Sequence, residues 1–79
     1  MNSILIIKDG KINPCFVKAN LHLTEHFYQE FELGGNNDQV LKELWQSKFK
    51  ATLEKHNGYF NKIIFNSSKD LTMFNLRFD

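Results

Sequence analysis

The sequence predicts an α+β fold, a small two-layer domain with an antiparallel sheet in the order βββ-α-ββ and one amphipathic helix packed on one face. Two observations support it. Apolar residues alternate with polar ones along much of the chain, as in half-buried strands, and one central stretch repeats them every four residues, as in a helix. The 79 residues, with 42% hydrophobic residues and eight phenylalanines, indicate a single packed domain, 1–79.

The first strand is expected over residues 3–8. It contains four consecutive apolar residues, 4–7, which in a strand point alternately to both faces of the sheet. Asp9-Gly10 then predicts a two-residue hairpin turn. Because one helix covers one face only, apolar side chains on the other face are expected to meet a partner or a second copy of the chain. The residues assigned to this face are Leu5, Ile7, Tyr59 and Ile63.

The second strand is expected after the turn and through residue 23. Val17, Ala19, Leu21 and Leu23 alternate with polar residues, which is the period of a half-buried strand. Pro14 cannot donate a hydrogen bond to a neighbouring strand, so its end of the strand is expected at a sheet edge.

Residues 24–33 are compatible with two structures. As a strand, Phe27, Phe31 and Leu33 share one face; as a helix capped by Thr24, Phe27 and Phe31 come together at four-residue spacing. The alternation continues to a glycine pair at 34–35, which favours the strand.

The helix is expected over about 37–57. Asn36 or Asn37 can cap it, with Gln39 three residues after Asn36 in a capping-box arrangement. Asn57-Gly58 is typical of a left-handed helix end. The apolar residues that repeat every four positions are Leu41, Trp45, Phe49 and Leu53.

Two further strands are expected at 59–65 and 71–78, joined by a polar turn. In the last one Phe74, Leu76 and Phe78 share one face, with Asn75 and Arg77 on the other.

Composition excludes several classes. The net charge of +1 lacks the strongly basic balance of a dedicated nucleic-acid-binding domain. A single cysteine excludes an internal disulfide framework. No apolar run approaches the roughly 20 residues that cross a bilayer, and no secretory signal is recognisable. We therefore expect a cytoplasmic protein, located in the host cytoplasm if it is encoded by a phage.

Residues with catalytic or metal-binding potential are few. His22 and His26 have the spacing of a helical zinc pair, but both fall in a predicted strand and turn, with only Cys15 to complete a site. Gly34-Gly35 lacks the lysine of a phosphate loop. We expect no enzymatic activity, no catalytic residues, no metal and no cofactor.

Small single-domain chains without catalytic motifs are often stoichiometric inhibitors. The sequence therefore predicts a protein-binding module that sterically blocks a larger protein or nucleoprotein complex, such as a phage anti-defence (anti-CRISPR) protein, an antitoxin or an immunity protein. The residues expected to contact a basic partner surface are Glu25, Tyr28, Glu30 and Glu32.

An alternative is a small protein that binds single-stranded nucleic acid, because helix lysines and sheet aromatics could contact phosphates and stack on bases. The lysines assigned to that role are Lys42, Lys48, Lys50, Lys55 and Lys62.

Overall fold

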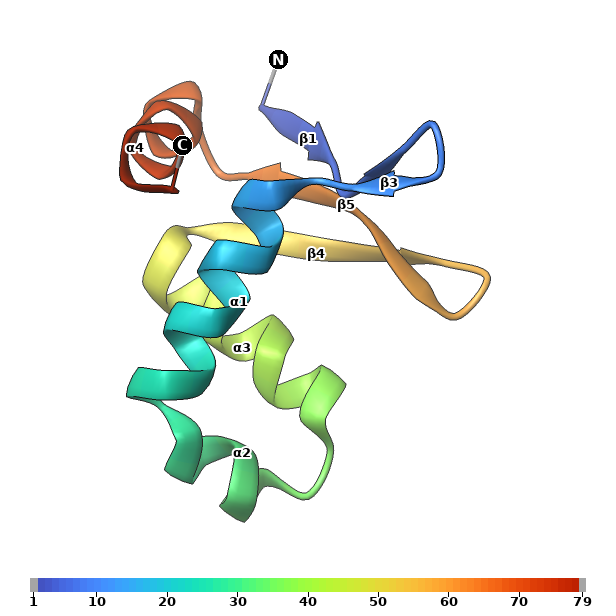
Figure 1. The fold of residues 1–79 in the computed structure, drawn as a ribbon. Coiled ribbons are helices and arrows are strands. Elements are labelled where there is room, and N and C mark those ends of the chain that lie inside the picture. Colours follow the sequence, from blue (N-terminus) through green and yellow to red (C-terminus); the bar gives the residue numbers. More distant parts are fainter. Residues whose placement is uncertain (1, 79) are drawn as a thin grey trace.

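The computed structural model describes residues 2–78, which form an α+β domain with antiparallel sheets and four helices (Figure 1). The predicted fold class is confirmed, but the order βββ-α-ββ is wrong because three expected extended stretches are helical. The elements are β1 (Ser3–Leu5), β2 (Ile7–Lys8), β3 (Lys11–Ile12), α1 (Pro14–His26), α2 (Tyr28–Gly34), α3 (Asn37–Phe49), β4 (Ala51–His56), β5 (Tyr59–Phe65) and α4 (Ser68–Phe78).

The main sheet has the order β1-β5-β4, with both neighbours antiparallel to the central β5. Ile63 of β5 pairs with Ile4 on one side and Leu53 on the other, and it is only 1% exposed. In Figure 1, α2 and α3 lie on one side of β4, α1 runs across the strands toward α2, and α4 lies near the start of β1. Ile63 therefore belongs to the core rather than to an open face.

The apolar run 4–7 is divided between two sheets. Ile6 is 2% exposed and lies between β1, which joins the main sheet, and β2, which pairs only with β3. Leu5 and Ile7, on either side of it, are 47% and 45% exposed. The predicted Asp9-Gly10 hairpin is confirmed, and both residues have positive φ, 54° and 75°, as a primed two-residue turn requires.

The predicted second strand is wrong beyond Ile12, because the chain enters helix α1 at Pro14. The Asn13 side chain caps this helix by accepting a hydrogen bond from the Cys15 N–H at 2.8 Å, and proline is well suited to the first helical turn. Ala19 and Leu23, four residues apart, are fully buried. Residues that a strand would place on the same face are therefore separated on the helix surface.

The strand favoured over 24–33 is also wrong. The segment contains the end of α1 and the helix α2, which begins at Tyr28 directly after Phe27. Phe27 and Phe31 are half-buried against the core at four-residue spacing, as the helical alternative predicted. The predicted Thr24 cap is wrong, because Thr24 lies inside α1 and its hydroxyl donates a hydrogen bond to the Asn20 carbonyl. The helix exposes Leu33, which the strand interpretation had placed beside them.

The predicted helix start is confirmed, since the Asn36 side chain accepts a hydrogen bond from the Gln39 N–H at 3.2 Å. The predicted end at residue 57 is wrong. Lys50 adopts a left-handed conformation, φ 56°, and ends α3, so that 51–56 form the strand β4. Asn57-Gly58 is instead the tight turn between β4 and β5, with φ of 53° and 83°.

The strand predicted at 59–65 is confirmed as β5, whereas the strand predicted at 71–78 is the helix α4. The Ser67 hydroxyl accepts a hydrogen bond from the Asp70 N–H at 3.2 Å and donates one to the Asp70 carboxylate at 2.9 Å, which caps this helix. Phe74 and Phe78 are buried at four-residue spacing.

Aromatic rings from three elements meet in the core. The ring of Phe74 in α4 lies 5.3 Å from Trp45 and 5.5 Å from Phe49, both in α3, and 5.2 Å from Phe65 in β5. Phe78 lies 5.3 Å from Phe49. We call these five residues the aromatic cluster. In the described part of the chain, no helix is long and apolar enough to cross a membrane.

Candidate functional site

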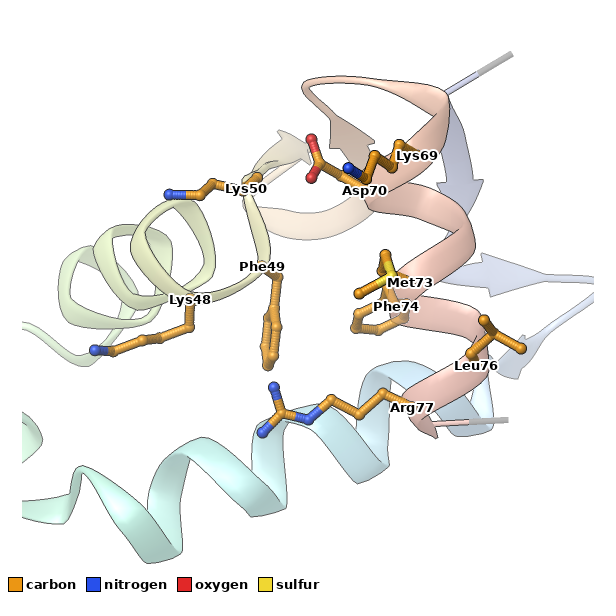
Figure 2. Close-up of a pocket in the computed structure, with 9 residues that line it drawn as sticks. All are labelled: Lys48, Phe49, Lys50, Lys69, Asp70, Met73, Phe74, Leu76 and Arg77. Carbon is orange, nitrogen blue, oxygen red and sulfur yellow. The ribbon is translucent and has the colours of Figure 1, made fainter.

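An open groove of about 490 Å³ lies between the C-terminal end of α3 and one face of α4 (Figure 2). Aromatic and aliphatic side chains form its floor, and mostly cationic side chains surround it. The residues that line it are Lys48, Phe49, Lys50, Lys69, Asp70, Met73, Phe74, Leu76 and Arg77.

The left-handed residue Lys50 creates the α3 side of this groove. Because α3 ends there, the lysines before and after Phe49 lie on the surface while the Phe49 ring turns toward α4 (Figure 2). On α4, Met73 is exposed and Phe74 is buried beside Phe49. The floor is therefore continuous with the aromatic cluster.

The charge around the groove differs from that of the chain as a whole. Its lining contains four cationic residues and one acidic residue, whereas the rest of the chain has six lysine or arginine residues and eight acidic residues. The Asp70 carboxylate accepts a hydrogen bond from Ser67 and so takes part in the helix cap. This distribution favours a ligand with a negative charge.

Arg77 links the groove to α1. One guanidinium nitrogen lies 2.8 Å from Nε2 of His22, and the guanidinium stacks on the Phe78 ring at 5.2 Å. Burial, the charge of Arg77 and the charge of His26 lower the pKa of His22, while Glu25 acts in the opposite direction. A neutral His22 accepts the hydrogen bond that Arg77 donates.

Lys48 has a second partner within the fold. Its ammonium lies 4.6 Å above the ring of Phe27, which follows α1, and Figure 2 shows it extending away from Phe49. Lys50 and Lys69 are exposed on opposite sides of the groove, one after α3 and one in α4. These two lysines are the cations most available to a ligand.

The acidic residues predicted to contact a partner do not line the groove. Glu25 lies in α1, and the other three residues of that set lie in α2: Tyr28, Glu30 and Glu32. All four are exposed, but they lie on helices rather than on one strand.

The predicted lysine set is also dispersed. Lys42 and Lys48 lie in α3 and Lys50 ends it, as a helix from 37 would place them, whereas Lys55 lies in β4 and Lys62 in β5. Of the five, only Lys48 and Lys50 line the groove. Of the predicted partner face, Tyr59 is exposed in β5, as are Leu5 and Ile7 at the start of the chain.

Sequence reasoning missed Lys69, Met73 and Arg77, which lie one helical turn apart on the groove side of α4. Their four-residue spacing was present in the sequence, but it was obscured by the alternation of the phenylalanines that predicted a strand. The cap formed by Ser67 and Asp70, which are three residues apart, was the available signal for a helix.

The thiol and the imidazoles do not converge. Cys15 lies at the first turn of α1, half-buried, and His22 and His26 lie further along the same helix with their rings 4.4 Å apart. The two histidines thus have the helical arrangement that their spacing allows, although a strand was predicted for this segment. Residues 2–78 contain no group of three His, Cys, Asp or Glu side chains that could hold a metal ion.

A family model described as "SPASM: Iron-sulfur cluster-binding domain" matches residues 1–74. This chain belongs to the SPASM family. No curated protein and no solved structure matches it.

The family assignment corrects the predicted function. A SPASM domain points to iron–sulfur proteins, so the prediction of a phage anti-defence inhibitor, an anti-CRISPR protein, an antitoxin or an immunity protein is wrong. The family description gives no support to the single-stranded nucleic-acid alternative either.

The donor set of this SPASM domain does not fit the cluster that its family description names. Iron–sulfur clusters are held by several cysteine thiolates, four in the common types and two with two histidines in Rieske centres. This chain has one cysteine. Cys15 and His22 are two turns apart on α1, about 10 Å along the helix axis at 1.5 Å per residue. The residues of this chain therefore supply at most one thiolate ligand.

Proposed function

We propose that this SPASM domain is a ligand-holding accessory domain of a radical SAM iron–sulfur protein, and that it binds an organic anion with an apolar portion in the groove between α3 and α4. The observation that carries the proposal is the composition of the groove: four cations and one carboxylate surround an apolar floor in a chain of net charge +1.

The groove offers two kinds of interaction to one ligand. Lys50 and Lys69 stand on opposite sides and attract an anionic group, while Met73 and Leu76 present exposed apolar surface next to them. Ligand sites commonly combine a mostly apolar lining with a few charged groups that fix orientation. A ligand that carries a carboxylate or phosphate beside an aromatic or aliphatic group matches both.

The radical SAM context is supported by the family to which residues 1–74 belong. In that context the cluster chemistry is supplied by residues outside this chain, since the chain has only one cysteine. What this chain contributes is a preformed cationic groove on a small folded support.

The groove is tested by titrating the labelled chain with the peptide N-acetyl-Glu-Phe-Glu-amide while backbone amide signals are followed by NMR. We expect saturable shifts concentrated at the ends of α3 and α4. The matched peptide N-acetyl-Gln-Phe-Gln-amide, which has the same shape without the charges, is expected to bind more weakly. Equal shifts from both peptides would contradict an anion site.

A matched pair of double variants assigns the binding to the groove. Lys50→Gln with Lys69→Gln is expected to weaken binding roughly fivefold or more, since each exposed charge contact is worth up to about 1 kcal/mol. Lys11→Gln with Lys18→Gln removes the same charge from exposed positions in β3 and α1. If the second pair weakened binding as much as the first, general charge attraction rather than the groove would account for it.

The context is tested by light scattering. The chain is measured alone first, which establishes its oligomeric state, and then in mixtures with purified radical SAM proteins of the same organism. A complex of defined stoichiometry supports the accessory role. If every such protein leaves the mass of the chain unchanged, that role is excluded for a separate chain of residues 1–79.

A further inference from the structure

We infer that this SPASM domain folds without an iron–sulfur cluster. Its helices and central strand are held together instead by the packing of the aromatic cluster, Trp45, Phe49, Phe65, Phe74 and Phe78. The inference starts from the disagreement between the family description and the donor set, and it goes beyond the proposed ligand groove, on which it does not depend.

The ligand count argues against a cluster held by this chain. With one cysteine, neither a four-cysteine site nor a site with two cysteines and two histidines can be assembled. His56, at the end of β4, lies on a different element from the thiol and the other two histidines of the chain. Two copies of the chain together would supply two thiolates, which is still short of a four-cysteine site.

The interior of the domain is apolar. Among the described residues, no polar or charged residue is buried as a whole, although the Asn61 side-chain oxygen is buried without a hydrogen-bond partner, and the largest fully buried side chain is Trp45. A chain of this length buries a small core with a thin margin of stability, and small domains often add a metal, disulfides or dense packing to it. In this domain, dense packing of aromatic side chains provides that additional stability.

The aromatic contacts connect elements that are far apart in the sequence. Trp45 stacks on Phe16 of α1 at 5.5 Å and packs against Phe49 at 4.8 Å. Phe74 brings α4 onto the same rings and onto Phe65 of the central strand. A single side chain, Phe74, thus ties α3, α4 and β5 together, which is the role that a structural metal has in other small domains.

The inference is tested by anaerobic incubation of the chain with ferric iron, sulfide and dithiothreitol, which together supply both oxidation states of iron, followed by desalting. We expect substoichiometric iron, no visible charge-transfer absorption and a thermal midpoint within about 2 °C of the untreated chain. The midpoint of the Cys15→Ser variant is likewise expected to be the same with and without the iron and sulfide treatment. Stoichiometric iron and sulfide that Cys15→Ser abolishes, or a marked rise of the midpoint with iron, would overturn the inference, whether one copy or two held the cluster.

The aromatic cluster is tested in the same iron-free conditions. Phe74→Leu is expected to lower the thermal midpoint by several degrees, and Phe74→Ala by about 10 °C or more if it remains folded. Leu76→Ala, on the same helix but exposed, is the control and should change it little. If Phe74→Leu lowered the thermal midpoint as little as Leu76→Ala, the aromatic cluster would not be what holds these elements together. The groove titration has a separate readout, so either proposal can fail alone.

Discussion

The indole N–H of Trp45 donates a hydrogen bond to the side-chain oxygen of Asn20 at 2.9 Å. Trp45 is fully buried in α3, and Asn20 lies half-buried in α1, so this bond joins two helices across the core. Without Asn20 the indole would lose its partner in an apolar environment. Loss of this one hydrogen bond is therefore expected to destabilise the packing of α1 against α3.

We predict that Asn20→Ala lowers the free energy of unfolding by about 1–3 kcal/mol, because a buried donor is then left without an acceptor. Urea unfolding followed by Trp45 fluorescence measures the change. Asn75→Ala, an exposed asparagine in α4, is the matched control and should be close to neutral. An equal loss in both variants would show that the Trp45 hydrogen bond is not the cause.

The pKa of His22 predicts a pH dependence of stability. Burial, Arg77 and His26 lower this pKa from its ordinary value of 6.5, so the unfolded chain binds more protons than the folded one just below that pH. Stability is then complete above pH 6.5 and falls as the pH decreases toward the lowered value.

The measurement compares urea midpoints at pH 7.5 and about pH 5.5, near the lower end of the usual histidine range. We expect His22→Gln to reduce the decrease on acidification. His56→Gln, which changes an exposed histidine of β4, should retain the decrease seen in the unmodified chain. A decrease that survives unaltered in His22→Gln would assign it to other groups.

The turn between β4 and β5 predicts a position-specific effect of side chains. Gly58 has a φ of 83°, and no atom beyond its chain neighbours lies within 4 Å of the place that a Cβ would occupy, so any cost arises from the backbone conformation and not from a tertiary clash. We predict that Gly58→Ala destabilises the domain by about 1 kcal/mol and that Gly58→Asn costs less, because asparagine tolerates this conformation. Thermal unfolding of the two variants gives the comparison; the reverse order would contradict it.

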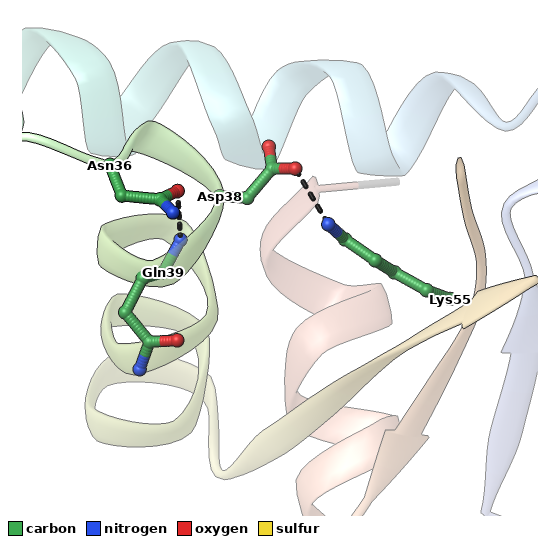
Figure 3. Close-up of polar contacts among 4 residues, drawn as sticks. All are labelled: Asn36, Asp38, Gln39 and Lys55. Carbon is green, nitrogen blue, oxygen red and sulfur yellow. Dashed lines mark hydrogen bonds and ion pairs between the residues drawn. The ribbon is translucent and has the colours of Figure 1, made fainter. Parts of the chain in front are cut away.

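The ion pair between Asp38 and Lys55 joins the first turn of α3 to β4 at 2.7 Å, next to the Asn36 cap (Figure 3). Both side chains are exposed, 55% for Asp38 and 39% for Lys55. We therefore predict a coupling energy below about 1 kcal/mol in a double-mutant cycle of Asp38→Asn and Lys55→Gln, decreasing further in 1 M salt. A larger, salt-independent coupling would mean that the pair is more important to the fold than its exposure indicates.

Several local features were predictable because their causes are local. Asp9-Gly10 forms a tight turn, Asn36 caps a helix and 59–65 form a strand, as the sequence indicated. Each depends on the conformational preferences of a few adjacent residues or on one short stretch rich in aromatic and β-branched residues. The α+β class followed from the same signals.

The helices α1 and α4 were mistaken for strands for a shared physical reason. Apolar residues at positions i, i+2 and i+4 satisfy the alternation of a strand, and the first and third also satisfy the four-residue spacing of a helix. In α4 these residues are Phe74, Leu76 and Phe78; the structure buries the two phenylalanines and leaves Leu76 78% exposed. Whether such a segment forms a strand or a helix depends on whether another part of the chain buries the middle residue.

The groove depends on contacts between distant parts of the chain. Nothing near Lys50 in sequence predicted that the helix ends there, since Leu53 continues the four-residue repeat, yet the chain turns because Ala51 and Leu53 are both buried in β4. Lys69 and Arg77 reach the same groove only because Phe74 packs on Phe49. Local preferences set the turns and caps, whereas the burial of aromatic rings against distant partners chose between helix and strand and assembled the candidate site.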